Sequence, residues 1–202
     1  MQRFLLWSGI DAWRAEAALV ELTGDGIRAG GTQLGVDPVP YRLDYELEAH
    51  EQFVTRALRV SAQGEGWARR IDLRHDGRGA WSCEAEAEGE VDLPAPGGDT
   101  DALAGALDCD LGRSPLTNLM PVRRHSLHKQ PGKLDFLMAW VSVPDLVLHR
   151  YPQRYEHVRA DRHGSIVRFV DRGHSPGFVS ELELDGDGLI LVYPHLARRV
   201  GS

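Results

Sequence analysis

Eight polar side chains that could do chemistry stand among core-forming residues in the stretch from Leu107 to Tyr155. They are Asp108, Asp110, Thr117, Asn118, Arg123, Arg124, Gln153 and Tyr155. A buried polar group without a partner costs about 1 to 3 kcal/mol, so these side chains need partners in the protein or in a ligand. Their density beside the apolar run FLMAWVSVPDLVL predicts a lined pocket or a polar network.

Asp108 and Asp110 are the most specific pair in this stretch, because they are two residues apart among apolar neighbours. On a β-strand this spacing points both carboxylates to the same face. If that face is turned inward, both acids need partners, and Arg123 and Arg124 are candidates by their chemistry. Two interpretations stay open, a structural Asp–Arg network that fixes a tight loop and a ligand pocket.

In the pocket interpretation, the residue types suit sugar recognition. The carboxylates and Asn118 would hydrogen-bond sugar hydroxyls, which both donate and accept, while Tyr155 or Trp140 would offer an aromatic ring face. Paired carboxylates could instead hydrolyse a glycosidic bond, which requires two acids about 5 Å or about 6.5 to 9.5 Å apart. The sequence does not place Asp108 and Asp110 across a substrate, and we assign no catalytic residue.

Other motifs do not indicate a metal, a cofactor or a second catalytic centre. His125 and His128 have the closest spacing among the histidines, but no H-x-E or H-E-x-x-H motif accompanies them. Cys83 and Cys109 lack CxxC spacing, and we expect reduced thiols. Residues 173–177 spell G-x-S-x-G, but a proline follows the serine and has no N–H to donate to an oxyanion.

The elements that must position these residues are mostly strands. Apolar and polar residues alternate in PYRLDYELEA and WSCEAEAEGEVDL, which is typical of strands with one solvated face. Clusters of Gly, Pro and Asp separate nine further predicted strands: RFLLW, FVTRALRVSA, RRIDLRH, LDFLMAWVSV, DLVLHR, RYEHVRA, SIVRFVD, FVSELELD and LILVYP. The sequence DGDG at 185–188 predicts a hairpin between the last two.

One short helix is predicted, from about Pro115 to His125. Ser114 can accept hydrogen bonds from the first free N–H groups, and Pro115 suits the first helical position. Pro121 counts against this helix, because an interior proline removes a hydrogen bond. The competing segment TDALAGAL contains more helix formers, but Gly105 breaks it.

Length, composition and charge limit the classes of protein to which this chain can belong. A chain of 202 residues with 42% hydrophobic and 26% charged residues is typical of one soluble domain, here residues 1–202. The formal net charge of -7 repels a phosphate backbone, so we expect no nucleic-acid partner. The N-terminal apolar run is too short for a signal peptide or a membrane span, which predicts a cytoplasmic protein without stable membrane insertion.

The block D-x-D-L-x-x-S-P-L-T-N-x-x-P-V-R-R, from Asp108 to Arg124, resembles the signature of the Putative glycolipid-binding family, a bacterial domain long classed as of unknown function. The resemblance continues through AWVSVPDL, QRY and DGDGLILVYP. It implies a mostly β fold, a large antiparallel sheet spiralling as a β-roll around a single α-helix, remotely like lipoprotein-carrier folds. It also implies an acidic pocket and a homodimer. The family's characteristic positions fall on Asp108, Asp110, Thr117, Asn118, Arg123, Arg124, Gln153, Tyr155, Asp187 and Tyr193.

Three functional hypotheses follow. The first is binding, without catalysis or cofactor, of a glycolipid or another sugar-bearing amphiphile, with a role in bacterial glycolipid or cell-envelope metabolism. The second is a sugar or glycolipid hydrolase that uses Asp108 and Asp110. In the third, the polar block is structural and supports an oligomer. Replacing either Asp with Asn should abolish turnover in an enzyme, yet only shift affinity or stability in a binding protein.

Overall fold

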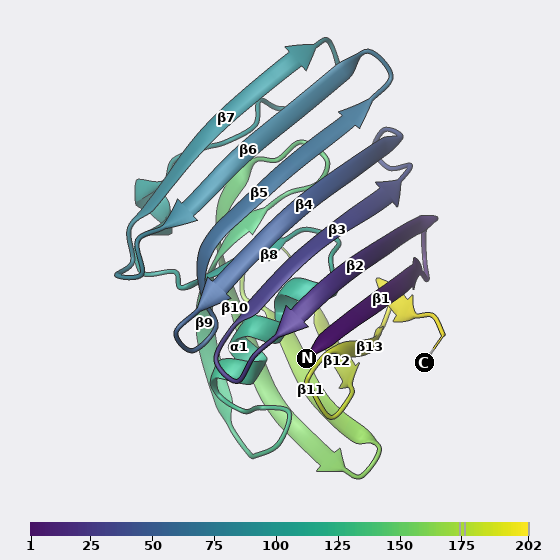
Figure 1. Ribbon diagram of the computed structural model, residues 1–202, viewed down its shortest axis with the longest axis vertical. Helices are drawn as coiled ribbons and strands as arrows, with labels where there is room; N and C mark the ends of the chain where they lie inside the picture. Colours follow the sequence, from purple (N-terminus) through teal and green to yellow (C-terminus); the bar gives the residue numbers. More distant parts are fainter. Residues whose placement is uncertain (174, 176, 202) are drawn as a thin grey trace.

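The computed structural model describes residues 1–173, 175 and 177–201, and these residues form a curled sheet with little helix (Figure 1). In this part of the chain, fourteen strands lie in one sheet in the order β7-β6-β5-β4-β3-β2-β1-β14-β13-β12-β11-β10-β9-β8. The strands are β1 (Gln2–Gly9), β2 (Arg14–Leu22), β3 (Ile27–Gly35), β4 (Tyr41–His50), β5 (Val54–Gly64), β6 (Trp67–His75), β7 (Trp81–Gly89), β8 (Asp108–Leu111), β9 (Lys133–Val141), β10 (Leu148–Asp161), β11 (Gly164–Asp171), β12 (Val179–Leu184), β13 (Ile190–Tyr193) and β14 (Ala197–Arg199).

The predicted fold class is confirmed, with one exception in strand direction. The sheet is open, with β7 and β8 at its edges, and neighbouring strands are antiparallel except for β8 and β9, which run parallel. Strands β1 to β7 form the front layer in Figure 1, and the later strands curl behind them around a short helix. Buried side chains such as Leu43, Leu58 and Leu119 fill the space between the layers.

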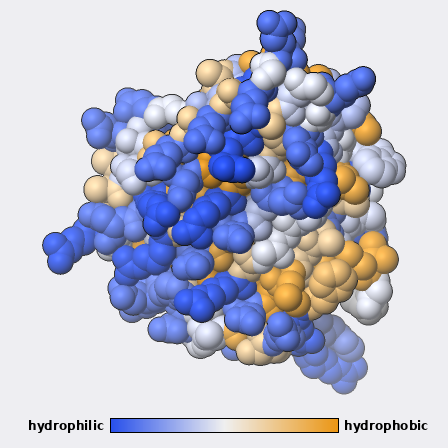
Figure 2. Space-filling view, turned by 45° about the horizontal axis from the view of Figure 1, so that its top comes forward, coloured by the Kyte–Doolittle hydropathy of each residue, from blue (hydrophilic) through white to orange (hydrophobic). Residues whose placement is uncertain are grey.

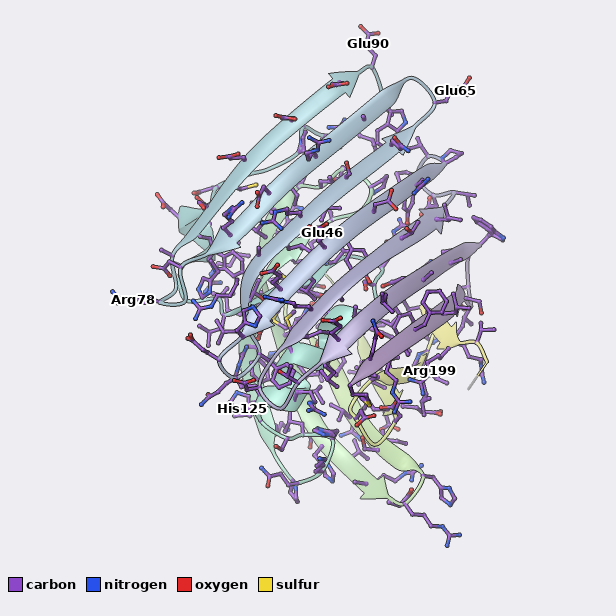
Figure 3. All side chains as sticks on the ribbon, viewed as in Figure 1. Glu46, Glu65, Arg78, Glu90, His125 and Arg199 are labelled. Atoms are coloured by element: carbon purple, nitrogen blue, oxygen red, sulfur yellow. The ribbon has the colours of Figure 1, made fainter. Side chains whose placement is uncertain are left out.

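Alternation decides which face of β4 is buried. In β4, Tyr41, Leu43, Tyr45 and Leu47 point inward, as the sequence predicts, and the charged residues between them are partly or fully exposed. Each inward side chain is removed from water by the opposite layer, which favours the curled sheet through apolar burial. The outward face of β4 therefore carries charged residues, and Glu46 projects from the middle of the front layer (Figure 3).

Strands β2 and β3 are missing from the sequence prediction, and each departs from a simple alternating pattern. In β2 a glutamate, Glu16, occupies an inward position. In β3 two consecutive glycines interrupt the apolar pattern. A Cβ atom on Gly31 would lie 2.5 Å from the Tyr45 ring, so the sheet requires a glycine there.

The predicted strands DLVLHR and RYEHVRA are a single strand, β10, which continues through Tyr151 and Pro152. The predicted DGDG hairpin is confirmed, since β12 and β13 are adjacent and antiparallel. Asp185 Oδ1 accepts hydrogen bonds from the N–H groups of Asp187 and Leu189, each at 3.0 Å. Gly188 has a φ of 81°, which a glycine adopts without strain.

The predicted helix is present as a 3-10 turn, η2 (Leu116–Asn118), followed by α1 (Leu119–Arg124). Ser114 Oγ accepts the N–H of Leu116 at 3.2 Å, but Pro115 and not Ser114 occupies the N-cap position of the turn. Pro121 is tolerated because it lies in the first turn of α1, where N–H groups have no partner within the helix. The competing segment forms only the 3-10 turn η1 (Asp101–Leu103). No helix in the described residues has the length and apolar character needed to cross a membrane.

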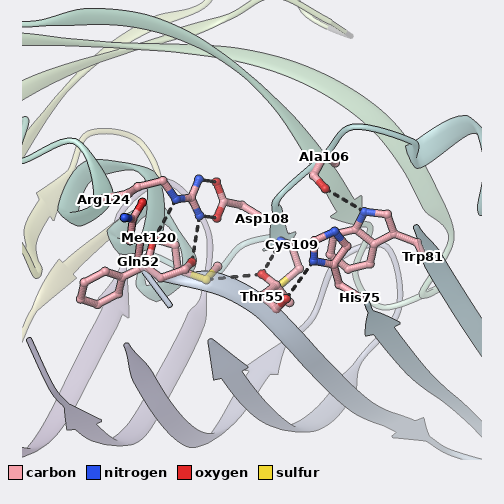
Figure 4. A network of polar contacts seen from close by, with 10 residues as sticks. Gln52, Thr55, His75, Trp81, Ala106, Asp108, Cys109, Met120 and Arg124 are labelled. Carbon is pink, nitrogen blue, oxygen red and sulfur yellow. Dashed lines mark hydrogen bonds and ion pairs between the residues drawn. The ribbon is translucent and has the colours of Figure 1, made fainter. Parts of the chain in front are cut away.

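The curl brings the edge strand β8 against β5 (Figure 4). The N–H of Thr55, at the start of β5, donates to Leu107 O at 3.0 Å, and Thr55 Oγ1 accepts the N–H of Cys109 at 2.9 Å. His75 and Trp81 extend this contact, because Trp81 Nε1 donates to Ala106 O at 3.0 Å. The two bonds of Thr55 join segments up to 54 positions apart in the sequence, the bond of Trp81 joins segments 25 positions apart, and together they hold β8 in the interior.

Candidate functional site

A pocket of about 310 Å³ opens where the β8–η2 segment meets β9 to β11 and the β13–β14 loop. Four of the predicted residues line it: Asp110, Asn118, Gln153 and Tyr193. The family block on β8 and η2 supplies two of them, and distant strands supply the other two. The structure therefore brings part of the predicted set together around one space.

Asp110 is the carboxylate that the family block contributes to this pocket. Its two oxygens accept hydrogen bonds from Thr117 Oγ1 at 2.7 Å and from Gln153 Nε2 at 2.6 Å. Neither partner carries a charge, so burial dominates and raises the pKa of Asp110 to about 6. Near neutral pH this acid is an ionised acceptor that is ready to bind a hydroxyl donor.

A second layer of neutral groups orients this acceptor. The Tyr155 hydroxyl lies 2.8 Å from Asn118 Oδ1 and 3.0 Å from Gln153 Oε1, and it donates toward these carbonyl oxygens. This contact turns the amide nitrogen of Gln153 toward Asp110. Tyr155 is fully buried, and burial raises the pKa of its hydroxyl well above the usual range, so it remains a donor. Thr117 and Tyr155 thus support the pocket from behind.

A second carboxylate, Asp171, lines the same pocket and was missed by the sequence analysis. It accepts a hydrogen bond from the Tyr151 hydroxyl and from the N–H groups of Gly173 at 2.7 Å and Ser175 at 3.0 Å. A signal was present, because Asp171 continues the inward alternation of Val167 and Phe169 in β11. The G-x-S-x-G segment follows directly, but its positions 174 and 176 lie outside the described residues.

Aromatic rings form the apolar part of the lining. The Trp140 and Tyr151 rings lie side by side with centroids 5.3 Å apart, and Phe169 contacts Phe178 at 6.1 Å. Tyr193 is 9% exposed, and burial raises the pKa of its hydroxyl. Carboxylates beside ring faces are the combination that a sugar, with polar edges and an apolar face, requires.

Asp108 has a different role, although it lies on the same strand. Both of its oxygens bind the Arg124 guanidinium, with Nη1 2.8 Å from Oδ2 (Figure 4). The two side chains are only 1% and 6% exposed. Arg124 also donates to Gln52 O and Phe53 O, each at 2.9 Å. This arrangement ties β8 and α1 to the β4–β5 turn, and it leaves Asp108 with no access to the pocket.

Arg123 also lies away from the pocket. Its Nη1 donates to Asp187 O at 2.9 Å, and its guanidinium lies 5.2 Å from the centroid of the Phe53 ring. Arg123 therefore fixes the DGDG hairpin turn against the β4–β5 turn. Four of the residues that the resemblance implies stabilise the fold and do not line the pocket. They are Asp108, Arg123, Arg124 and Asp187.

Glu16 is a further buried carboxyl, and it lies behind the pocket wall. It accepts hydrogen bonds from Tyr45 OH at 2.7 Å, Ser114 Oγ at 2.7 Å and Gln33 Nε2 at 3.3 Å. No cation faces it among these partners, and burial raises its pKa to about 7. Its inward position in β2 was the sequence signal that could have identified it.

A larger hollow of about 650 Å³ lies on the outward face of β3 to β7, but its chemistry is that of a solvated sheet. Arg59 in its lining is ion-paired with Glu46 at 3.2 Å and with Asp72 at 3.5 Å. Figure 2 shows hydrophilic residues over most of this face. No group of three or more His, Cys, Asp or Glu in the described residues could hold a metal ion.

Comparison with known proteins agrees with this fold. The model of the family described as Putative glycolipid-binding matches residues 4–199. The chain is similar to the crystal structure of a DUF1089 family protein from Pseudomonas aeruginosa, with 25% sequence identity and a TM-score of 0.70 over 96% of this chain and 94% of that chain. No curated protein matches the sequence significantly. Because the family model covers nearly the whole chain, the protein belongs to the Putative glycolipid-binding family.

Proposed function

We propose that the protein binds the sugar head group of a glycolipid or related amphiphile in the pocket around Asp110, without catalysing a reaction. The observation that carries this proposal is the placement of Asp110, a carboxylate held by neutral donors beside an aromatic wall. Sugar hydroxyls would donate to Asp110 and Asp171, and the less polar face of the ring would lie against Trp140 and Tyr151.

The size of the pocket favours a head group over a whole lipid. Its volume of about 310 Å³ is at the lower end of the range of about 300 to 1000 Å³ for small-molecule sites. An acyl chain would have to extend beyond it. The two carboxylates Asp110 and Asp171 in its lining support the acidic pocket that the family resemblance implies. A role in glycolipid or cell-envelope metabolism would follow from a sugar-bearing ligand.

We do not favour the hydrolase that would use Asp108 with Asp110. Both oxygens of Asp108 are occupied by Arg124 within the protein interior, so this acid could neither protonate nor attack a sugar in the pocket. The two unpaired cysteines suit the reducing cytoplasm that the sequence predicts. The homodimer implied by the resemblance remains part of this proposal.

The test is thermal unfolding in the presence of octyl glycosides below their micelle concentrations, because a ligand that binds only the folded state raises the melting temperature. We expect at least one glycoside to stabilise the protein, and octanol, which lacks the sugar, to have little effect. Asp110→Asn should weaken glycoside binding about tenfold or more, since it removes a charged hydrogen-bond acceptor.

Glu46→Gln is the matched control, because Glu46 is a carboxylate on the outward face of the sheet. This variant should bind the glycoside as the unmodified protein does. Equal stabilisation by octanol, or unchanged affinity in Asp110→Asn, would contradict a sugar site at Asp110. Native mass spectrometry of protein purified without detergent would identify any amphiphile that remains bound.

A further inference from the structure

Three large apolar side chains are exposed together on two neighbouring loops. Ile10 and Trp13 lie on the β1–β2 loop and are 44% and 63% exposed, and Val36 begins the β3–β4 loop and is 48% exposed. We call these three residues the apolar tip. Both loops lie at the same end of the front layer, on the right of Figure 1. Apolar groups gathered in this way on a water-facing surface indicate an interaction site.

Strand register brings the apolar tip together. Arg14, the first residue of β2, pairs with Gly35, the last residue of β3. Trp13 precedes this pair and Val36 follows it, so the two side chains leave the sheet next to each other. Ile10 is held at the start of the same loop, because its N–H donates to Leu196 O at 3.2 Å.

One hydrogen bond and one ion pair connect the apolar tip to the proposed sugar pocket. Asp11 contacts His195 at 3.0 Å, and Asp37 contacts Arg113 at 3.1 Å. His195 and Arg113 both line the pocket, as does Leu196. The tip therefore stands beside the pocket mouth, where the apolar chain of a bound amphiphile would emerge.

The charge around the tip differs from that of the whole chain. Its two acids, Asp11 and Asp37, face His195 and Arg113, and Arg14 adds a further positive charge. The formal charge of these five residues is zero with neutral histidine, whereas the chain carries -7. This end can therefore approach an anionic or zwitterionic surface without the repulsion that the rest of the protein would meet.

The apolar surface continues from the tip along the sheet. Phe4, Leu6, Leu19 and Leu34 are 67%, 40%, 47% and 39% exposed on β1 to β3. Phe4 pairs with Leu19 across the β1–β2 register. Figure 2 shows hydrophobic residues gathered at its lower right, on the side of the sheet where β1 lies. The tip is thus one end of a longer apolar strip.

We propose that the apolar tip docks on the surface of a lipid bilayer, with Trp13 at the level of the head groups, and places the pocket mouth where an amphiphile leaves the membrane. This inference rests on the proposed function, since it assigns the surface from which the ligand is taken. An indole ring suits this position because its body is apolar and its N–H is polar. The contact is peripheral and reversible, without insertion of a helix.

The experiment is co-sedimentation of the full chain with vesicles of phosphatidylcholine containing a minor fraction of phosphatidylglycerol. We expect the unmodified protein to sediment with the vesicles and the double variant Trp13→Ser, Val36→Asp to lose about tenfold or more of its affinity, because it removes two exposed apolar side chains. Val158→Asp is the matched control. Val158 is an apolar residue of β10 with 38% exposure, and its replacement should leave vesicle binding unchanged.

Binding of octyl glycoside separates this inference from the proposed function. The tip variant should bind the glycoside normally, whereas Gln153→Ala should lose glycoside binding and still bind vesicles. No vesicle binding by the unmodified protein, or equal binding by the tip variant, would overturn the inference. A dimer that the tip variant dissociates, in a protein that does not bind vesicles, would overturn it in favour of a second copy as the occupant.

Discussion

Asp108 and Asp110 stand two residues apart on β8 and both reach toward the η2–α1 segment, yet their surroundings are opposite. Asp108 binds the cation Arg124 and is 1% exposed. Asp110 binds only the neutral donors Thr117 and Gln153, and it lines the pocket. The first carboxylate is satisfied inside the protein, whereas the second retains the capacity to accept a ligand.

The difference shows that the charge of the partner separates a structural acid from one that is available for binding. A bidentate guanidinium supplies both the opposite charge and the donors that a buried carboxylate needs, so nothing remains for a ligand. Neutral donors leave the negative charge uncompensated. Burial raises the pKa of Asp110 to about 6 and the pKa of Glu16 to about 7. Burial also raises the pKa of Asp108, but there the Arg124 guanidinium acts in the opposite direction.

Replacing Arg124 should have the largest effect on stability. Arg124→Ala leaves Asp108 buried without its cation, so we expect a loss of about 3 to 5 kcal/mol in the free energy of unfolding, measured by urea denaturation. Arg59→Ala is the control, because its ion pairs lie on the outward face and exposed pairs contribute about 1 kcal/mol or less. Similar losses in the two variants would show that the Asp108–Arg124 pair does not hold the fold.

Glu16 tests how a buried carboxyl without a cation affects the pH dependence of stability. Its pKa is raised from 4.5 to about 7, so the folded state binds its proton more tightly than the unfolded state does. The resulting stability is fully present below pH 4.5 and is lost as pH rises through 7. The shift corresponds to about 3 kcal/mol. Glu16→Gln should remove this share of the pH dependence and make the protein more stable than the unmodified chain at pH 8.

The surroundings of Glu16 can accept this replacement. Gln33 Oε1 is buried without a partner, and it can accept a hydrogen bond from the new amide if the Gln33 side chain flips. Tyr45 and Ser114 can continue to donate to the remaining carbonyl oxygen. Urea denaturation between pH 4.5 and 8 checks the prediction, and an unchanged pH dependence in Glu16→Gln would refute it. The raised pKa of Asp110 contributes in the same direction and should persist in this variant.

Asn118 tests how far the neutral network is structural. Asn118→Ala removes the Oδ1 acceptor of the buried Tyr155 hydroxyl, so we expect a loss of about 1 to 3 kcal/mol in the free energy of unfolding. The affinity for an octyl glycoside should fall as well, because Asn118 lines the pocket and holds the Tyr155 hydroxyl that contacts Gln153. Stability measured by urea denaturation and affinity measured separately would show the two effects. If the variant shows the expected loss in the free energy of unfolding but binds the glycoside with unchanged affinity, the role of Asn118 is purely structural.

Replacing Thr117 should have the smallest effect on stability, and it tests whether the Thr117 hydroxyl stabilises the charged form of Asp110. Thr117→Val removes a donor that favours the ionised carboxylate, so the pKa of Asp110 should rise further above 6. NMR titration of the side-chain carboxyl carbon measures this directly. The same variant should cost about 1 kcal/mol of stability at pH 8. A pKa that falls or stays constant would mean that Thr117 does not stabilise the charge.

The local features of this protein can be predicted from its sequence. Period-two alternation predicted most strands and the placement of Asp108 and Asp110 on a common face. The spacing of Ser114 and Pro115 predicted the short helix, and the DGDG turn predicted the β12–β13 hairpin. Each of these features depends on neighbours within a few residues, which is the range over which backbone geometry and capping act.

The partner of each polar residue, in contrast, depends on how distant segments pack in the folded protein. Alternation places Glu16 and Asp171 on the inward side of their strands, but it does not reveal Ser114 as a partner of Glu16, 98 positions away. It also does not distinguish Arg124, which binds Asp108, from its neighbour Arg123, which binds a hairpin turn. These pairings arise when the sheet curls and β8 meets β5. A pattern within one strand carries no information about which distant segment the curl brings against it.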